Sequence, residues 1–140
     1  FLPPRVFSEF VTPYLQRLVR AYRDRGAWVI KHTDGNIMPI IEDLVSAEPH
    51  ALHSLDPMAG VDIAEVKQRY GDRLCLIGNV DCSLLQTGTQ EEMAHSARYA
   101  LQHGKPGGGY IFGTSNCVFA GMPPESYQLI HDIWRRDRAY

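Results

Sequence analysis

The segment His32-Thr33-Asp34-Gly35 holds the two side chains whose types and spacing point most directly to chemistry. Alternate residues of a strand point to the same side, so an imidazole and a carboxylate two positions apart can face one site. Such a pair could bind a metal ion or act as a general acid and base. The structural alternative is that Asp34 orients a turn and caps the next helix, while His32 bonds a neighbouring backbone group. Burying both groups is costly unless they are used or paired, which favours the functional interpretation.

A second polar group lies at residues 78–81, Gly-Asn-Val-Asp. Asp81 could bind a substrate hydroxyl or amine as a catalytic residue, or it could cap the segment that follows. Asn79 could bind substrate, or its amide could tie adjacent loops together. Asn36 and Asn116 also follow predicted strands and are candidate substrate-binding residues, although Asn36 could instead cap a helix.

Three cysteines stand far apart, without a Cys-x-x-Cys motif, so the sequence favours a reducing cytoplasm over a disulfide scaffold. Cys117 follows the last predicted strand, at the same edge of the sheet as His32. Its thiolate would be a good zinc ligand, and its thiol would be an ordinary small apolar side chain. Cys82 begins a helix-like stretch, and Cys75 lies in a predicted strand, so both are expected to be structural.

Short apolar segments must position these residues. Strands are predicted at 27–31, 51–55, 74–77 and 110–113, and segments with helical spacing at 5–25, 37–47, 62–70, 90–103 and 124–138. Strands that are apolar throughout, rather than alternating, are typical of parallel sheets covered by helices. The fold class is therefore α/β, as a small open sheet or as half of a closed (β/α)₈ barrel. In either fold the chemistry lies at the carboxyl ends of the strands.

The remaining histidines receive no functional role. His50 and His53 are expected at the entrance to the second strand, and His95, His103 and His131 on outer helices. Two helix starts have the spacing of a capping box, Asp62 with Glu65 and Thr89 with Glu92.

Composition bounds the function further. The chain has 140 residues and a mass of 15.8 kDa, which is enough for one hydrophobic core but too little for two full domains. We expect residues 1–140 to form a single partial domain. With 14 basic and 16 acidic residues, the net charge of −2 argues against a nucleic-acid or membrane-surface partner. No run approaches the roughly 18 apolar residues of a membrane span. The chain begins with Phe1, and we expect it to be a piece of a longer protein.

Several motifs together resemble the uroporphyrinogen decarboxylase superfamily. They are His-x-Asp-Gly-Asn at 32–36, Gly-Asn-Val-Asp at 78–81, Gly-Gly-Tyr-Ile-Phe at 108–112, Met-Pro-Pro-Glu-Ser-Tyr at 122–127 and Pro-Tyr-Leu-x-Arg at 13–17. The resemblance covers the whole chain and the carboxyl-terminal half of such a protein. It implies the last four βα units of a (β/α)₈ barrel, with one preceding helix.

The resemblance implies two enzyme activities. In the corrinoid-linked methyltransferases, zinc is held by a His-x-Cys pair and a later cysteine, and here Asp34 stands in place of the first cysteine. The leading hypothesis is zinc-dependent methyl transfer or demethylation, with His32, Asp34 and Cys117 as ligands and a corrinoid carried by a partner protein. Asp81 and Asn79 would line the pocket and orient the substrate. The alternative is a carboxy-lyase that needs no cofactor and acts on a tetrapyrrole, with Asp34 or Asp81 as the catalytic residue that stabilises a protonated pyrrole. A third reading is a non-catalytic α/β binding module.

The half-barrel hypothesis also predicts a partner. The first and last strands would each lack a neighbour, leaving two open edges. We therefore expect the fragment alone to be inactive, and to pair with a missing amino-terminal half or with a second copy of itself.

Overall fold

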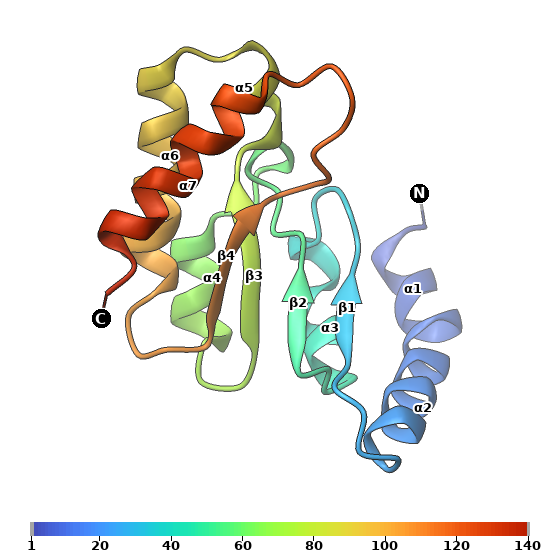
Figure 1. Cartoon of the computed structure of the whole chain (residues 1–140). Helices are drawn as coiled ribbons and strands as arrows, with labels where there is room; N and C mark the ends of the chain where they lie inside the picture. Colours follow the sequence, from blue (N-terminus) through green and yellow to red (C-terminus); the bar gives the residue numbers. More distant parts are fainter. Residues whose placement is uncertain (1, 140) are drawn as a thin grey trace.

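The computed structural model describes residues 2–139 and contains one parallel sheet of four strands in the order β1-β2-β3-β4 (Figure 1). The strands are β1 (Ile30–His32), β2 (Ala51–His53), β3 (Cys75–Val80) and β4 (Tyr110–Thr114). The helices are α1 (Pro4–Phe10), α2 (Thr12–Arg23), α3 (Ile41–Ser46), α4 (Ile63–Tyr70), α5 (Cys82–Thr87), α6 (Gln90–Gly104) and α7 (Pro124–Asp137), with short 3₁₀ helices η1 (Met38–Ile40) and η2 (Pro57–Ala59). The predicted α/β fold is confirmed.

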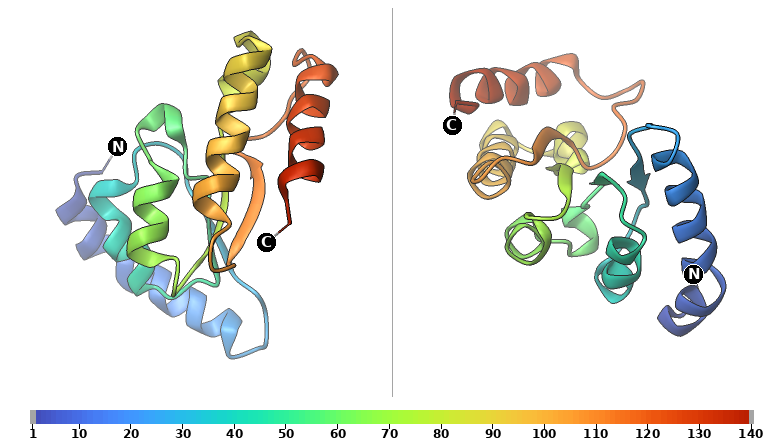
Figure 2. Two further views of the ribbon diagram at one scale, coloured as in Figure 1. Left: turned by 90° about the vertical axis from the view of Figure 1, so that its left-hand side faces the viewer. Right: turned by 90° about the horizontal axis from the view of Figure 1, so that it is seen from below.

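Strand order follows chain order, and every neighbouring pair is parallel. The view from below shows the helices in an arc around one side of the sheet (Figure 2). This arrangement is consistent with part of a (β/α)₈ barrel. None of the helices within residues 2–139 is long and apolar enough to cross a membrane.

Several boundaries differ from the predictions. Strand β1 begins at Ile30 rather than at 27, and β2 ends at His53 rather than at 55. Two further differences concern the first helical segment and β3. The segment predicted as one helix over 5–25 is two helices, α1 and α2, which meet at Val11. Pro13 explains the break, because it lacks an N–H and is tolerated only in the first turn of a new helix. Strand β3 runs three residues past its predicted end at Ile77. The prediction ended the strand there because glycine and asparagine favour turns, whereas Gly78 and Asn79 lie within the strand, both with positive φ.

The two predicted capping boxes turn out differently. At Thr89 the box is complete: Thr89 Oγ1 accepts from the Glu92 backbone N–H, and Glu92 accepts from the Thr89 N–H. Asp62 caps α4 by accepting from the Ala64 N–H at 2.9 Å, as expected. Glu65 does not reach back; it pairs with Arg69 one turn later, at 2.9 Å.

The core between sheet and helices has two clusters that meet at Tyr110 on β4. One contains Leu52 and Leu76, both fully buried, and the other contains Val80 and Ile133. The Tyr110 hydroxyl donates to the Gly78 carbonyl at 2.9 Å, so its single polar group is satisfied.

Burial raises the pKa of Tyr110 well above its ordinary value. In the unfolded chain a tyrosine ionises near pH 10. Above that pH the unfolded state therefore binds fewer protons than the folded state, and the free energy of unfolding must fall as pH rises. We expect Tyr110→Phe to weaken this fall in urea unfolding between pH 9 and 11. Equal pH slopes for the two proteins would contradict the assignment.

Candidate functional site

The carboxyl ends of β1, β2 and β4 bring five polar side chains together. His32 ends β1 and pairs in register with His53, which ends β2. Ser54 directly follows β2, and Asp34 and Asn116 lie two residues beyond the ends of β1 and β4. We call these five residues the rim cluster.

Asp34 is the common partner in the rim cluster. Its Oδ1 lies 3.4 Å from His32 Nε2 and accepts a hydrogen bond of 3.1 Å from Asn116 Nδ2. The buried Ser54 hydroxyl lies 3.5 Å from the same oxygen. Donors from three segments thus orient a carboxylate that remains more than half exposed, at 58% of its side chain. An oriented, accessible carboxylate can accept a proton or stabilise a cation.

His53 was not predicted as a site residue, and its expected place at the strand entrance is wrong. Strand β2 has only three residues, so His50 lies before its amino end and His53 at its carboxyl end. His50 Nδ1 accepts from the Val29 backbone N–H at 3.0 Å, which is a structural role. The feature of the sequence that could have placed His53 at the carboxyl end of its strand is that Ser54 and Leu55, which follow it directly, end the apolar run.

The two histidines of the rim cluster face each other. His32 Nδ1 and His53 Nδ1 are 2.6 Å apart, and their ring centroids are 4.7 Å apart. One nitrogen must therefore donate and the other accept, so the pair shares a single hydrogen. Burial, and then the charge of His32, lower the pKa of His53, against smaller raising contributions from the Thr114 backbone and Asp34. Burial and the neighbouring His32 thus both favour the neutral form of His53.

Lys31 also lies close to this edge. Its Nζ donates to the His32 carbonyl. Burial lowers the pKa of Lys31, and the nearby Asp34 charge opposes that shift. Lys31 thus lies beside the rim cluster without entering it.

The structure does not place Asp81 and Asn79 with the rim cluster. They line a separate cavity of about 410 Å³ between residues 57–62, α5 and α6. Asp81 Oδ1 accepts from the Ser83 N–H at 2.8 Å and so caps α5. The Asn79 amide, almost fully buried, donates to the Leu55 and Val61 carbonyls at 2.6 and 3.1 Å. Asp81 therefore caps a helix and Asn79 connects two loops, which are the structural alternatives that the sequence left open. The catalytic role of Asp81 and the substrate-binding role of Asn79 stay predictions.

Asn36 and Cys117 flank the rim cluster. Asn36 Oδ1 accepts from the Met38 N–H at 3.0 Å and so orders the turn before η1, whose cap residue is Ile37. Cys117 is exposed, and its carbonyl accepts a hydrogen bond from the Cys82 thiol at 3.3 Å. Cys117 and Asn116 line a cavity of about 260 Å³ beside α5. Within residues 2–139, no three His, Cys, Asp or Glu side chains are grouped closely enough to hold a metal ion.

Comparison with known proteins finds relatives over almost the whole chain. The family model described as "Uroporphyrinogen decarboxylase (URO-D)" matches residues 1–136. The curated uroporphyrinogen decarboxylase of Thioalkalivibrio sulfidiphilus is 30% identical over 135 residues, covering 94% of this chain and 37% of that protein. Those of Aliivibrio salmonicida and Pseudoalteromonas translucida are 25% and 27% identical, covering 94% and 89% of this chain and 37% and 35% of theirs. The chain thus spans little more than a third of the length of these relatives.

Proposed function

Because this chain belongs to the uroporphyrinogen decarboxylase family, we propose that it supplies the carboxyl-terminal part of a barrel that decarboxylates a polycarboxylated tetrapyrrole. The names of the curated relatives support this reaction over methyl transfer, which was the leading hypothesis from the sequence. The observation that carries the proposal is the Asp34 carboxylate, held by His32 and Asn116 at the carboxyl edge of the sheet.

The reaction needs little beyond proton transfer and charge stabilisation. A pyrrole ring of the substrate is first protonated. The bond between an acetate methylene carbon and its carboxylate then breaks, its electron pair passes into the ring, and CO₂ leaves. A proton adds to the methylene carbon, which becomes a methyl group, and the ring releases its extra proton. The net change is one proton taken up and one CO₂ released.

The rim cluster offers the groups for these steps. Asp34 would lie against the protonated ring, where a carboxylate stabilises the positive charge that develops. His32 would supply the proton for the methylene carbon, with His53 accepting from its other nitrogen and fixing the ring orientation. The carboxylates of the substrate need cationic partners, and we expect these from the part of the barrel beyond this chain.

The proposal is tested with the protein in the full length that its source produces. The assay follows CO₂ release from uroporphyrinogen and loss of carboxyl groups from the product by mass spectrometry, with and without a metal chelator. Stepwise loss of carboxyl groups that survives chelation is expected. Absence of CO₂ release, together with absence of tetrapyrrole binding, would refute the proposal.

Zinc-dependent methyl transfer is retained as a second candidate because of one distance. Two atoms that each lie about 2.0–2.1 Å from a tetrahedral zinc ion are about 3.3 Å apart. His32 Nε2 and Asp34 Oδ1 are 3.4 Å apart. Two of the three predicted ligands therefore fit zinc, whereas Cys117 does not complete a three-residue group in this arrangement. Bound zinc would activate a thiol or polarise a methyl-bearing substrate, and the methyl group would pass to or from a corrinoid on a partner protein.

Thiol labelling tests the predicted ligand Cys117. Burial raises the pKa of Cys75 and of Cys82, so both should react slowly, while the exposed Cys117 reacts first. If Cys117 is a ligand, one zinc per chain should slow its alkylation at least about tenfold, and His32→Ala should remove this protection. Elemental analysis of both proteins gives the zinc content. Unchanged labelling with zinc present would remove Cys117 from the ligand set.

A further inference from the structure

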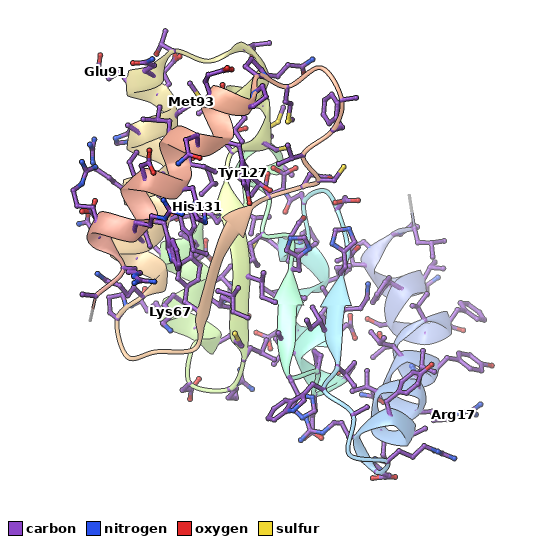
Figure 3. All side chains as sticks on the ribbon, in the orientation of Figure 1. Arg17, Lys67, Glu91, Met93, Tyr127 and His131 are labelled. Carbon is purple, nitrogen blue, oxygen red and sulfur yellow. The ribbon has the colours of Figure 1, made fainter. Side chains whose placement is uncertain are left out.

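Two of the three cysteines of this chain are in contact at the carboxyl edge of the sheet. Cys82 is the first residue of α5, and Cys117 lies in the loop between β4 and α7, the helix on which Figure 3 marks Tyr127. The Cys82 thiol donates to the Cys117 carbonyl at 3.3 Å, and both residues line the cavity of about 260 Å³ beside α5. Strands β3 and β4 are neighbours in the sheet, so this contact is made entirely within the chain.

The two cysteines are close enough for a disulfide bond. Because Cys82 Sγ lies 3.3 Å from the Cys117 carbonyl oxygen, ordinary bond lengths limit the distance between the two Cα atoms to about 8.5 Å. A disulfide spans roughly 4.4–6.8 Å between Cα atoms. A movement of at most about 2 Å therefore suffices. The loop that carries Cys117 has neither helix nor strand before Pro124, so no ladder of backbone bonds resists this movement.

Cys75 is not a competing partner for Cys82. It begins β3, whereas Cys82 follows the far end of the same strand. A strand rises about 3.3 Å per residue, which separates the two residues by roughly 20 Å. Within residues 2–139, Cys82 and Cys117 are therefore the two cysteines that can be joined, and Cys75 provides a matched control.

Two hydrogen bonds connect Cys117 to the rim cluster. The Cys117 N–H donates to Asn116 Oδ1 at 2.7 Å, and Asn116 Nδ2 donates to Asp34 Oδ1 at 3.1 Å. The Asn116 amide thus has one end on the backbone of Cys117 and the other end on the carboxylate. A change in the position of Cys117 therefore reaches Asp34 through a single side chain.

The start of the loop is fixed, which confines any movement to the residues that follow it. The Ser115 N–H donates to the Val80 carbonyl at 2.7 Å, and Ser115 Oγ accepts from the Cys82 N–H at 3.3 Å. Ser115 is also almost fully buried. When the sulfur of Cys117 approaches Cys82, Cys117 must therefore turn about this fixed point and take Asn116 with it.

We propose that Cys82 and Cys117 form a reversible disulfide that withdraws Asn116 from Asp34 and so lowers the activity of the site. The oxidant is a low-molecular-weight disulfide such as oxidised glutathione. The thiolate of the exposed Cys117 attacks one glutathione sulfur, the S–S bond breaks, and one glutathione thiolate leaves with the electron pair. The Cys82 thiolate then attacks the Cys117 sulfur and releases the second glutathione. The two cysteines lose two electrons and two protons, and one glutathione disulfide becomes two glutathione thiols.

Oxidation removes two contacts of the reduced protein. The Cys82 thiol loses its hydrogen, so its bond to the Cys117 carbonyl cannot persist. Turning Cys117 also breaks the bond from its N–H to Asn116 Oδ1, and Asp34 then loses a donor. Formation of the disulfide rests on these contacts alone, whereas its effect on turnover rests on the proposed decarboxylation.

Peptide mapping of the full-length protein tests the disulfide. The protein is incubated with oxidised glutathione, its remaining thiols are blocked, and it is digested without reductant for mass spectrometry. We expect two peptides joined through Cys82 and Cys117 that separate on treatment with dithiothreitol. Cys75→Ala should form the same joined peptides, and Cys82→Ser should leave Cys117 as a mixed disulfide with glutathione. If Cys117 of the unchanged protein keeps glutathione or stays reduced, the proposal is wrong.

Two further measurements test the connection to Asp34. In hydrogen exchange followed by NMR, the Cys117 amide should exchange at least about tenfold faster in the oxidised protein, because it loses its acceptor. In the decarboxylation assay, kcat should fall about tenfold, the effect of one hydrogen bond to a charged group. Cys117→Ser should show no fall under the same treatment.

The outcomes separate this proposal from the proposed reaction. Unchanged exchange of the Cys117 amide in the disulfide form would refute the connection to Asn116, whatever the activity. Full kcat in the oxidised protein would refute the effect on Asp34. Absence of decarboxylation by the reduced protein would refute the proposed function, while peptide mapping and amide exchange would still decide whether the disulfide forms and moves the loop.

Discussion

Replacing Asp34 with asparagine is expected to lower the decarboxylation turnover number by about 10²–10⁴-fold, the range that a positioned proton-transfer or charge-stabilising group supplies. The substitution keeps the size of the side chain but removes its charge. It also removes an acceptor from a site where His32 and Asn116 both approach Oδ1. Because the Asp34 side chain is 58% exposed, we expect little change in the free energy of unfolding.

A control substitution separates chemistry from general effects of charge. Asp132→Asn makes the same change on the outer helix α7, where Asp132 accepts a hydrogen bond from Gln128 at 2.7 Å. Its turnover should equal that of the unchanged protein. Steady-state measurements on the full-length proteins give kcat and KM for both variants. If Asp34→Asn keeps the full kcat, the carboxylate acts in neither proton transfer nor charge stabilisation.

The largest expected effect on stability comes from Gly78→Ala, at about 3 kcal/mol. Gly78 has φ +108°, a conformation that residues with a side chain rarely adopt. An added Cβ would lie 2.5 Å from the Ser54 carbonyl oxygen and 3.1 Å from that of Thr114. Both contacts are with backbone atoms of neighbouring segments, so neither can move aside as a flexible side chain would. Urea unfolding measures the loss.

Gly113→Ala is the matched control for Gly78→Ala. Gly113 lies opposite Asn79 in the neighbouring strand, and an added Cβ meets no atom within 4 Å. We expect a change below about 1 kcal/mol, since glycine in a strand is itself unfavourable relative to alanine. If both substitutions lowered the free energy of unfolding equally, the close backbone contacts at Gly78 would not be the cause of the loss of stability. The added Cβ of Gly78→Ala would push against Ser54, which belongs to the rim cluster. We therefore expect Gly78→Ala to lower both the activity and the free energy of unfolding, and Gly113→Ala to leave the activity unchanged.

Sequence reasoning located the strands because their apolar runs are flanked by glycine and polar turns, and the run at Tyr110 agrees closely with β4. It ended β3 too early, since nothing local shows that Gly78 and Asn79 occupy the ladder with positive φ. That geometry arises from tertiary contacts, chiefly the Asn79 amide with the Leu55 and Val61 carbonyls.

The rim cluster was predicted in part for a similar reason. His32 and Asp34 are two positions apart, so the strand period alone places them together. Asn116 was expected at the same edge, and its bond to Asp34 joins residues 82 positions apart. His53 was missed because its partner is set by the register of β1 on β2, which pairs His32 with His53. A one-residue change of register would have separated the two rings.

The agreement between strand order and chain order also has a consequence for how the molecule folds. Register partners such as Ile30 and Ala51, Ala51 and Cys75, or Leu76 and Tyr110 are 21, 24 and 34 residues apart, so within this sheet each strand pairs with the next one along the chain. Closing loops of this length costs less entropy than pairing strands from opposite ends of a long chain, although the cost grows only slowly with loop length. During synthesis each βα unit can dock onto the one before it as it leaves the ribosome, at about 5–20 residues per second. Within this sheet, β1 can therefore pair with β2 before β3 and β4 have been synthesised.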